Sequence, residues 1–213
     1  MKRIFLSSEV HFVAASIGPK IEPEVKVNAV FIITAIRDKP HTHLEWHYEN
    51  KASLEKEGFN FEVYDITGKR PKQIISDLSK YSAMYVEGGN SYYLLQESQR
   101  SGFKEFVRDK VNSGMVYIGT SAGSVIAGPD IEPVRQDSRA ALAPDLKGTN
   151  GYGLVDFVVM PHWGSEERRE LFNNYRIEHI YQEDFPYILL NNNQYVEVQD
   201  DWINIVDVGM EQT

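Results

Sequence analysis

The stretch Met-Val-Tyr-Ile-Gly-Thr-Ser-Ala-Gly-Ser, residues 115–124, decides how the rest of the chain is interpreted. An apolar run ends in Gly-Thr-Ser-Ala-Gly and is followed by small residues that can begin a helix. The pattern G-x-S-x-G in this context is typical of a buried strand that turns sharply into a helix and exposes its serine, here Ser121. The helix N-terminus beyond the turn offers free N–H groups where an oxyanion would develop. A plain Gly/Ser turn has the same letters, so the motif alone leaves both interpretations open.

On both sides of this stretch, short apolar runs alternate with segments that carry apolar residues at helical spacing. Residues 27–35 form a near-continuous β-branched run, which is typical of a strand covered on both faces. The predicted strands are residues 2–7, 27–35, 60–64, 83–86 and 155–160, and the predicted helices are residues 9–17, 44–58, 73–78, 91–99, 103–112 and 165–181. This alternation predicts an α/β fold with a mostly parallel central sheet and helices on both faces. Antiparallel pairing is expected near the C-terminal end, between residues 194–198 and 202–206.

The composition limits the classes of protein to consider. A chain of 213 residues is long enough for one substantial core, and we expect a single domain over residues 1–213. The net charge of −9, without a compensating basic block, argues against nucleic acid or an anionic membrane as partner. No apolar run approaches the length of a membrane span, and the N-terminus does not resemble a signal peptide, so we expect a cytoplasmic protein. With no cysteine in the chain, disulfides, cysteine zinc sites and thiol nucleophiles are excluded.

Three turns that follow predicted strands carry unusual chemistry. They are residues 87–90 (Glu-Gly-Gly-Asn), residues 119–123 around Ser121, and residues 160–164 (Met-Pro-His-Trp-Gly). Because ligands of parallel α/β sheets bind outside the carboxyl ends of the strands, these turns are expected to meet at one edge. Together they place backbone donors, a nucleophile and the base His162 on one rim.

At these residues the chain resembles the aspartyl dipeptidase (peptidase E) family of serine peptidases, which are relatives of the cyanophycinases. The resemblance spans most of the chain and is strongest over residues 83–163. It implies a three-layer sandwich similar to the class I glutamine amidotransferase-like, or flavodoxin-like, fold. It also implies Ser121 as nucleophile, His162 as base, and an oxyanion hole from the N–H groups of Gly89 and Ala122. Gly88 and Asn90, from the same turn as Gly89, are expected to contact substrate.

The third member of the triad departs from the family pattern. The aspartyl dipeptidases carry a Glu in a turn near the C-terminal strands, and Asn192 stands at the matching place here. An Asn oxygen can orient the histidine but cannot stabilise an imidazolium by charge. Asp137 is an alternative acid, because relatives also carry an Asp in that loop, and Asp130 and Glu132 are nearby. All three also fit the description of solvated loop acids.

The residues expected to determine substrate specificity also depart from the family pattern. The dipeptidases hold the aspartate of the substrate with an arginine in the helix after the base. Arg168, Arg169 and Arg176 are the candidates here, and Arg176 is the one we assign to substrate binding. The same segment also fits a normal charged helix face.

Two other patterns predict no further site. His41, His43 and His47 have zinc-like spacing, but no matching ligand set accompanies them, so no metal is expected. Residues 148–153 are rich in glycine but precede a predicted strand, so a nucleotide site is not expected. No cofactor is predicted.

Two hypotheses about function remain. The first is a serine hydrolase that cleaves a short peptide or an isopeptide. The second, favoured by Asn192, is a catalytically weak or inactive relative that binds a small ligand or a protein partner. The oligomeric state is open.

Overall fold

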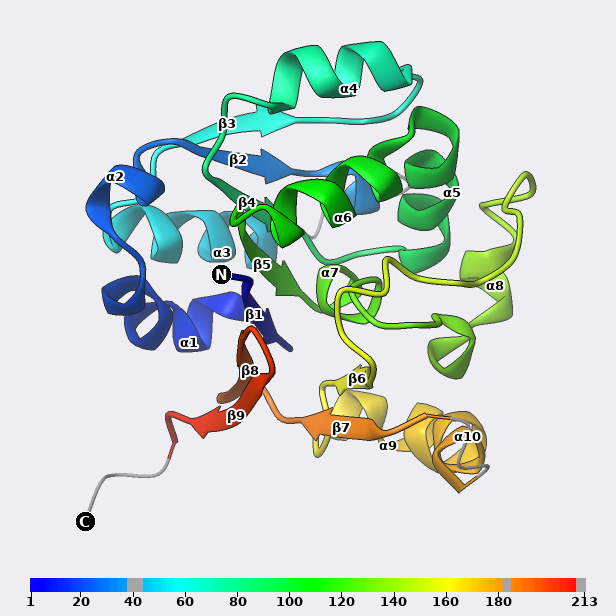
Figure 1. Cartoon of the computed structure of the whole chain (residues 1–213). Coiled ribbons are helices and arrows are strands. Elements are labelled where there is room, and N and C mark those ends of the chain that lie inside the picture. Colours follow the sequence, from blue (N-terminus) through cyan, green and yellow to red (C-terminus); the bar gives the residue numbers. More distant parts are fainter. Residues whose placement is uncertain (38–43, 182–184, 210–213) are drawn as a thin grey trace.

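The computed structural model describes residues 1–37, 44–181 and 185–209. At its centre is a seven-stranded sheet with the strand order β3-β2-β4-β5-β1-β8-β9 (Figure 1). Its strands are β1 (Arg3–Ser7), β2 (Ala29–Ile32), β3 (Phe61–Tyr64), β4 (Ala83–Val86), β5 (Val116–Thr120), β8 (Gln194–Gln199) and β9 (Trp202–Asp207). The first five pair in parallel, whereas β8 pairs antiparallel with both β1 and β9. The predicted α/β class and its mostly parallel sheet are confirmed.

Helices cover both faces of this sheet (Figure 1). The longer ones are α1 (Val10–Ile17), α3 (Glu45–Lys56), α4 (Pro71–Leu78), α5 (Ser91–Ser101) and α6 (Phe103–Asn112), and the short ones are α2 (Pro23–Lys26), α7 (Ala122–Val125), α8 (Asp137–Ala140), α9 (Arg169–Leu171) and α10 (Ile177–Tyr181). The remaining helical segments are η1 (Gly18–Lys20), η2 (Thr34–Ile36), η3 (Glu132–Val134), η4 (Glu166–Arg168) and the π-helix η5 (Phe172–Arg176).

Two apolar cores result from the alternation of side chains along the strands. In β2, Val30 and Ile32 face the core formed with α4, α5 and α6, whereas Ala29 and Phe31 face the core formed with α1 and α3. All four residues are buried. Strands with an apolar residue at every position can lie only between two covering layers, so the β-branched run of the sequence is explained by its central place in the sheet.

Two segments depart from the expected arrangement. The predicted strand at residues 155–160 is β6 (Val158–Pro161), which pairs in parallel with β7 (Tyr187–Leu190) in a separate two-stranded sheet. The predicted helix at residues 165–181 is divided into η4, α9, η5 and α10. Both departures lie around His162, at the end of β6. The segment that carries the candidate base is therefore less regular than its apolar pattern suggests.

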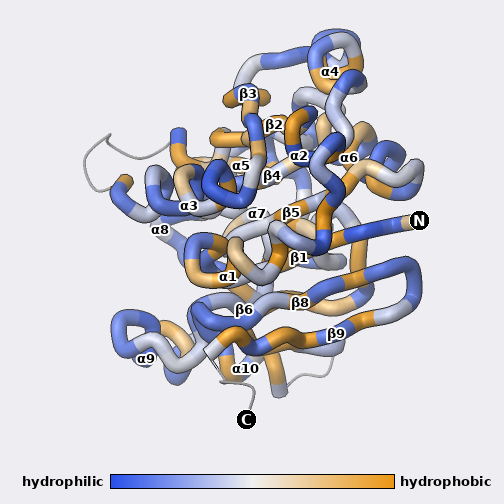
Figure 2. The backbone as a smooth tube through the Cα atoms, turned by 90° about the vertical axis from the view of Figure 1, so that its left-hand side faces the viewer, coloured by the Kyte–Doolittle hydropathy of each residue, from blue (hydrophilic) through white to orange (hydrophobic). Residues whose placement is uncertain are grey.

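Hydrophobic positions also reach the edge of the sheet. Figure 2 shows them along β9, where Ile203 and Ile205 are 45% and 51% exposed. In the described part of the chain, no helix combines the length and the apolar character needed to cross a membrane.

Candidate active site

The turn after β5 presents Ser121 in the way that the motif predicts. Ser121 has a positive φ of 47°, which a residue with a side chain adopts only under constraint. Its N–H donates to the carbonyl oxygen of Ser7 at 2.9 Å, so the end of β1 holds the turn in place. A Cβ at Gly123 would lie 2.1 Å from the carbonyl oxygen of Val86 on β4. Only glycine fits there, because α7 begins directly against the neighbouring strand.

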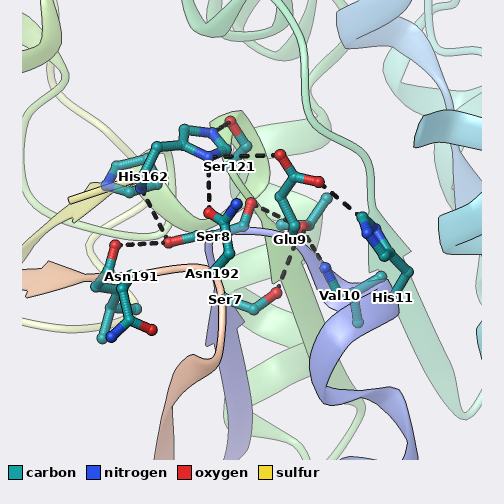
Figure 3. Close-up of polar contacts among 12 residues, drawn as sticks. Ser7, Ser8, Glu9, Val10, His11, Ser121, His162, Asn191 and Asn192 are labelled. Atoms are coloured by element: carbon teal, nitrogen blue, oxygen red, sulfur yellow. Dashed lines mark hydrogen bonds and ion pairs between the residues drawn. The ribbon is translucent and has the colours of Figure 1, made fainter. Parts of the chain in front are cut away.

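His162 follows the last residue of β6 and also has a positive φ, of 66°. Its backbone N–H donates to Oγ of Ser8 at 3.0 Å, and that hydroxyl donates to the carbonyl oxygen of Leu190 at 2.8 Å. Ser8 therefore ties the end of β6 to β1 and β7. The ring is oriented so that its Nε2 lies 3.0 Å from Oγ of Ser121 (Figure 3). The two residues that the sequence assigned as nucleophile and base are in hydrogen-bond contact.

Asn192 is the residue that contacts the other ring nitrogen. Its Oδ1 lies 3.3 Å from Nδ1 of His162 (Figure 3). The contact follows from the pairing of β6 with β7, in which Pro161 is the partner of Leu190. Because parallel strands end at the same edge, the residues after Pro161 and after Leu190 come together there. The structure thus places Asn192 where the family pattern places the acid.

A carboxylate that the sequence analysis did not consider lies at the same nitrogen. Oε1 of Glu9 is 3.6 Å from Nδ1 of His162, and its other oxygen is 3.5 Å from Nδ1 of His11 (Figure 3). Glu9 stands at the N-terminal boundary of α1, but its side chain does not cap the helix. The signal that could have found it is its position: Glu9 comes two residues after a strand that pairs in parallel with β5, with Ser7 opposite Thr120.

The loop acids proposed from the sequence lie elsewhere. The Asp137 side chain is 88% exposed, and its Oδ1 accepts a hydrogen bond from Arg135 at 2.7 Å. Asp130 accepts from the N–H of Glu132 in its own turn, and Glu132 pairs with Arg135 at 2.8 Å. These carboxylates are occupied within their own loop, and the structure does not bring Asp137 to the histidine.

The turn after β4 approaches Ser121 from the other side. Gly89 has a φ of 139°, and a Cβ there would lie 2.2 Å from the carbonyl oxygen of Ala35, so glycine is required. Its own carbonyl oxygen accepts a hydrogen bond from Nη1 of Arg139 at 2.8 Å, which turns this oxygen toward α8. Gly88 lies beside the nucleophile, because a Cβ there would be 3.1 Å from Cβ of Ser121. Gly88 and Gly89 both line the cleft that contains Ser121.

Asn90 has a structural role in place of the expected contact with substrate. The residue is fully buried, and its Oδ1 accepts from the N–H groups of Tyr92 and Tyr93, which caps α5. Its Nδ2 donates to the carbonyl oxygen of Arg139 at 3.0 Å. The prediction that Asn90 binds substrate is therefore corrected: the side chain fastens α5 to α8.

The arginines of the segment after His162 differ sharply in their surroundings. Arg176 is 6% exposed, donates weakly to the carbonyl oxygen of Pro161 at 3.5 Å, and has an Nε without a hydrogen-bond partner among the described residues. It lines a small cleft together with Ser121 and Arg168. Arg169, by contrast, is exposed and pairs with Glu166. Arg176 and Arg168 reach the site, and Arg169 does not.

Burial and nearby cations set the electrostatics of the site. Burial, together with the guanidinium of Arg168, lowers the pKa of His162 to about 4, although the hydrogen bond with Asn192 acts in the opposite direction. The ring is therefore neutral near pH 7 and able to accept a proton. Burial also lowers the pKa of Arg176 to about 10, with Arg168 and Arg139 contributing. Burial raises the pKa of Glu9 above its usual value, mainly by desolvation of the carboxylate.

Of the three histidines considered as metal ligands, only His47 lies among the described residues. His41 and His43 lie outside the described residues. Nδ1 of His47 lies 2.8 Å from the buried carboxylate of Glu87, which also accepts from Asn50 and from the hydroxyl of Tyr85. Within residues 1–37, 44–181 and 185–209, no group of three or more His, Asp or Glu side chains is arranged to hold a metal ion.

Known proteins resemble this chain in sequence and in fold. Residues 13–206 match the sequence pattern of Peptidase family S51. The chain belongs to peptidase family S51. A crystal structure of a candidate peptidase E protein from Listeria monocytogenes EGD-e superposes with a TM-score of 0.84 at 26% identity and covers 98% of this chain and 99% of that one. A peptidase from an acI-B1 Actinobacterium has the same fold, with a TM-score of 0.72 at 13% identity over 97% of this chain and 88% of that one.

Relatives within family S51 are also found by sequence. An uncharacterized peptidase of Listeria monocytogenes is 34% identical over 121 residues, which are 57% of this chain and 59% of that protein. Peptidase E of Streptomyces coelicolor is 29% identical over 132 residues, which are 60% of this chain and 53% of that protein. The matched segment thus spans just over half the length of these relatives. The resemblance to peptidase E that the sequence motifs indicated is confirmed.

Proposed function

We propose that this S51 family member is a serine peptidase that hydrolyses short peptides, with Ser121 as nucleophile and His162 as general base. The observation that carries the proposal is the 3.0 Å contact between Oγ of Ser121 and Nε2 of His162, combined with a polar partner on Nδ1. Such an arrangement, in which the base is itself oriented by a third group, is the one that activates a serine.

The chemistry follows from the position of the protons. Neutral His162 accepts the hydroxyl proton of Ser121 at Nε2 as Oγ attacks the carbonyl carbon of the scissile bond. The resulting imidazolium returns that proton to the leaving amine, and water then hydrolyses the acyl-enzyme by the same route. The low pKa of His162, about 4, supports this role because it keeps Nε2 unprotonated over the physiological range.

Backbone N–H groups supply the oxyanion hole in this proposal. Among the described residues, the N–H groups of Gly89 and Ala122 donate no hydrogen bond within the chain. Ala122 is the first residue of α7, so its N–H belongs to the unpaired set at a helix start. The bond from Arg139 to the carbonyl oxygen of Gly89 fixes the orientation of that peptide unit. Donors held in this way stabilise a developing oxyanion without reorganisation.

The substrate is small and carries a carboxylate beside the scissile bond. The cleft that contains Ser121 and His162 has a volume of about 170 Å³, which suits a dipeptide better than a folded chain. The adjoining cleft is lined by Arg139, Arg168 and Arg176 within reach of the same serine. A buried guanidinium with an unpaired Nε is stabilised by an anionic partner, so we assign Arg176 to an acidic side chain of the substrate.

The alternative is a relative that binds a ligand without catalysis, and Asn192 is the residue that favours it. An Asn at this place lacks the negative charge of the usual acid. The nucleophile and base are nevertheless in contact, which a pure binding module does not require.

Purified protein incubated with dipeptides of varied first residue tests the proposal. We expect hydrolysis of those that begin with an acidic residue, and a loss of about 10⁴-fold or more in Ser121→Ala. The matched control is Ser113→Ala, a surface hydroxyl at the end of α6 that bonds only to the carbonyl oxygen of Asp109. Cleavage that survives in Ser121→Ala, or a folded protein that cleaves no dipeptide, would contradict the proposal.

A further inference from the structure

The ring of His162 has two neighbours at Nδ1, and they differ in charge. Asn192 is neutral and lies 3.3 Å away, whereas Glu9 is a carboxylate and lies 3.6 Å away (Figure 3). An amide oxygen orients the ring, but it does not offset the positive charge that forms when Nε2 takes the serine proton. A second group is needed for that purpose if the rate is to approach that of a complete triad.

Glu9 is held in place by the backbone around it. Oγ1 of Thr120, the residue before the nucleophile, donates to the carbonyl oxygen of Ser8 at 3.2 Å and accepts from the N–H of Val10 at 3.1 Å. The residues on both sides of Glu9 are thus fastened to the end of β5. The backbone position of Glu9 is therefore set by the same strand pairing that places Ser121.

The Glu9 carboxylate uses its two oxygens separately: Oε2 lies 3.5 Å from Nδ1 of His11, and Oε1 is the oxygen beside His162. It does not cap α1, and its side chain is 27% exposed, so part of it faces the cleft. The charged and titratable groups that face it are His11 from α1, Glu49 from α3, and Glu167 and Arg168 from η4. His11 and Arg168 favour the ionised form of Glu9, whereas burial, Glu49 and Glu167 disfavour it.

We infer that Glu9 supplies the negative charge beside Nδ1 of His162 that Asn192 cannot supply, and that it acts as an electrostatic positioning residue for the Ser121–His162 pair. This inference rests on the proposed function. In a complete triad, one acid both orients the histidine and offsets its positive charge. Here Asn192, which follows β7, orients the ring, and Glu9, which follows β1, supplies the negative charge. A separation of 3.6 Å is longer than a strong hydrogen bond, but it is within the range of an ion pair and shortens as the imidazolium forms.

The test compares wild-type protein with Glu9→Gln, which keeps the shape and removes the charge. We expect kcat to fall by about 10- to 100-fold with little change in KM, since a charge-assisted bond that forms only in the transition state is lost. Glu9→Asp keeps the charge at a longer distance and should recover part of that loss. Asp137→Asn is the matched control: it also removes one carboxylate, but at an exposed site paired with Arg135, and we expect no change.

A second readout does not depend on turnover of a peptide. It is the rate at which a fluorophosphonate probe labels Ser121 near pH 7. In Glu9→Gln this rate should fall by about 10- to 100-fold, because the imidazolium that forms as Oγ attacks the probe loses its negatively charged neighbour. Asp137→Asn should be labelled at the wild-type rate, since that carboxylate is exposed and paired with Arg135. Circular dichroism confirms that each variant is folded.

The outcomes are distinct. An unchanged labelling rate of Ser121 in Glu9→Gln overturns the inference. A raised KM with unchanged kcat also overturns it, since Glu9 would then bind the ammonium group of the substrate. If the wild-type protein is labelled at Ser121 but cleaves no dipeptide, and labelling slows in Glu9→Gln, the proposed function fails and the role of Glu9 beside His162 is supported.

Discussion

Replacement of Arg176 by methionine should make the protein more stable and less able to cleave acidic substrates. The side chain is buried, and its Nε has no hydrogen-bond partner in the described residues. Burial lowers the pKa of the guanidinium from its usual high value to about 10, which corresponds to roughly 3 kcal/mol of unfavourable free energy for holding the charge in the folded state. Methionine has a similar length and no charge to desolvate.

Some favourable contacts are lost in the same substitution. The guanidinium lies 4.9 Å from the ring centroid of Phe172, and such a cation–π contact contributes about 0.5–1 kcal/mol. The bond to the carbonyl oxygen of Pro161, at 3.5 Å, is long and weak. The net gain is therefore about 2 kcal/mol, which for a chain of this size raises Tm by about 4–8 °C.

The loss of activity should depend on the substrate. Removing one partner of a buried charge pair costs about 2–5 kcal/mol, which is about 30- to 5,000-fold in kcat/KM. This loss should appear for a dipeptide that begins with aspartate and not for one that begins with asparagine. Arg169→Met is the control, because Arg169 is exposed and paired with Glu166, and it should leave both Tm and kcat/KM unchanged.

The assay is a thermal melt together with kcat/KM for the two dipeptides. A variant Arg176→Met that is destabilised by more than about 1 kcal/mol, and that loses both substrates equally, would refute the reasoning. In that case Arg176 would be a structural residue and the cleft would not be an anion site.

Three further predictions concern the catalytic residues. His162→Ala should reduce the hydrolysis rate about as much as Ser121→Ala, and the double variant little more, because the two act as one unit; additive losses in kcat/KM would contradict this. Asn192→Asp should leave the rate unchanged or lower it, since two carboxylates then crowd one ring; a large increase would mean that Glu9 supplies no charge. The wild-type protein should lose up to about 3 kcal/mol of stability as the pH falls from 6.5 to 4, because only the unfolded state protonates His162 in that window; urea unfolding of His162→Gln should show a smaller loss over the same range.

Much of the site could be predicted from the sequence, because its residues follow strands directly. Ser121 comes after β5, the Gly88–Gly89 pair after β4, and His162 after β6, and parallel strands bring their carboxyl ends to one edge. Asn192, the third candidate, follows β7 in the same way and lies 3.3 Å from Nδ1 of His162; its role stays a prediction. Local pattern was sufficient for these residues because each stands in a recognisable motif directly after a strand.

Glu9 was missed for a reason that the pairing of strands explains. Its closeness to His162 depends on β1 lying beside β5 and on β6 ending near both, and these pairings join residues more than 100 positions apart. Periodicity along the chain contains no information about such neighbours. Asp137 was an alternative acid because of its position in the loop, but its carboxylate is paired with the neighbouring Arg135.

The irregular helical segment after His162 could not be predicted from the apolar pattern of the sequence either. Apolar spacing predicted one helix over residues 165–181, whereas the structure contains a π-helix at Phe172–Arg176. A π-helix adds one residue to a turn and changes which side chains share a face. In this segment Phe172 and Arg176 are both buried, so the irregular helix carries a charged side chain on its inward face.

The central claim is that Ser121 is a nucleophile activated by His162, and its most direct test is labelling with a fluorophosphonate probe followed by peptide mapping. The probe reacts only with a serine whose proton is removed by a neighbouring base, and it requires no knowledge of the substrate. We expect a single adduct at Ser121 in the wild-type protein, none in Ser121→Ala, and a strongly slowed reaction in His162→Ala. A folded wild-type protein that remains unlabelled near pH 7, or that is labelled at a different residue, would contradict the claim.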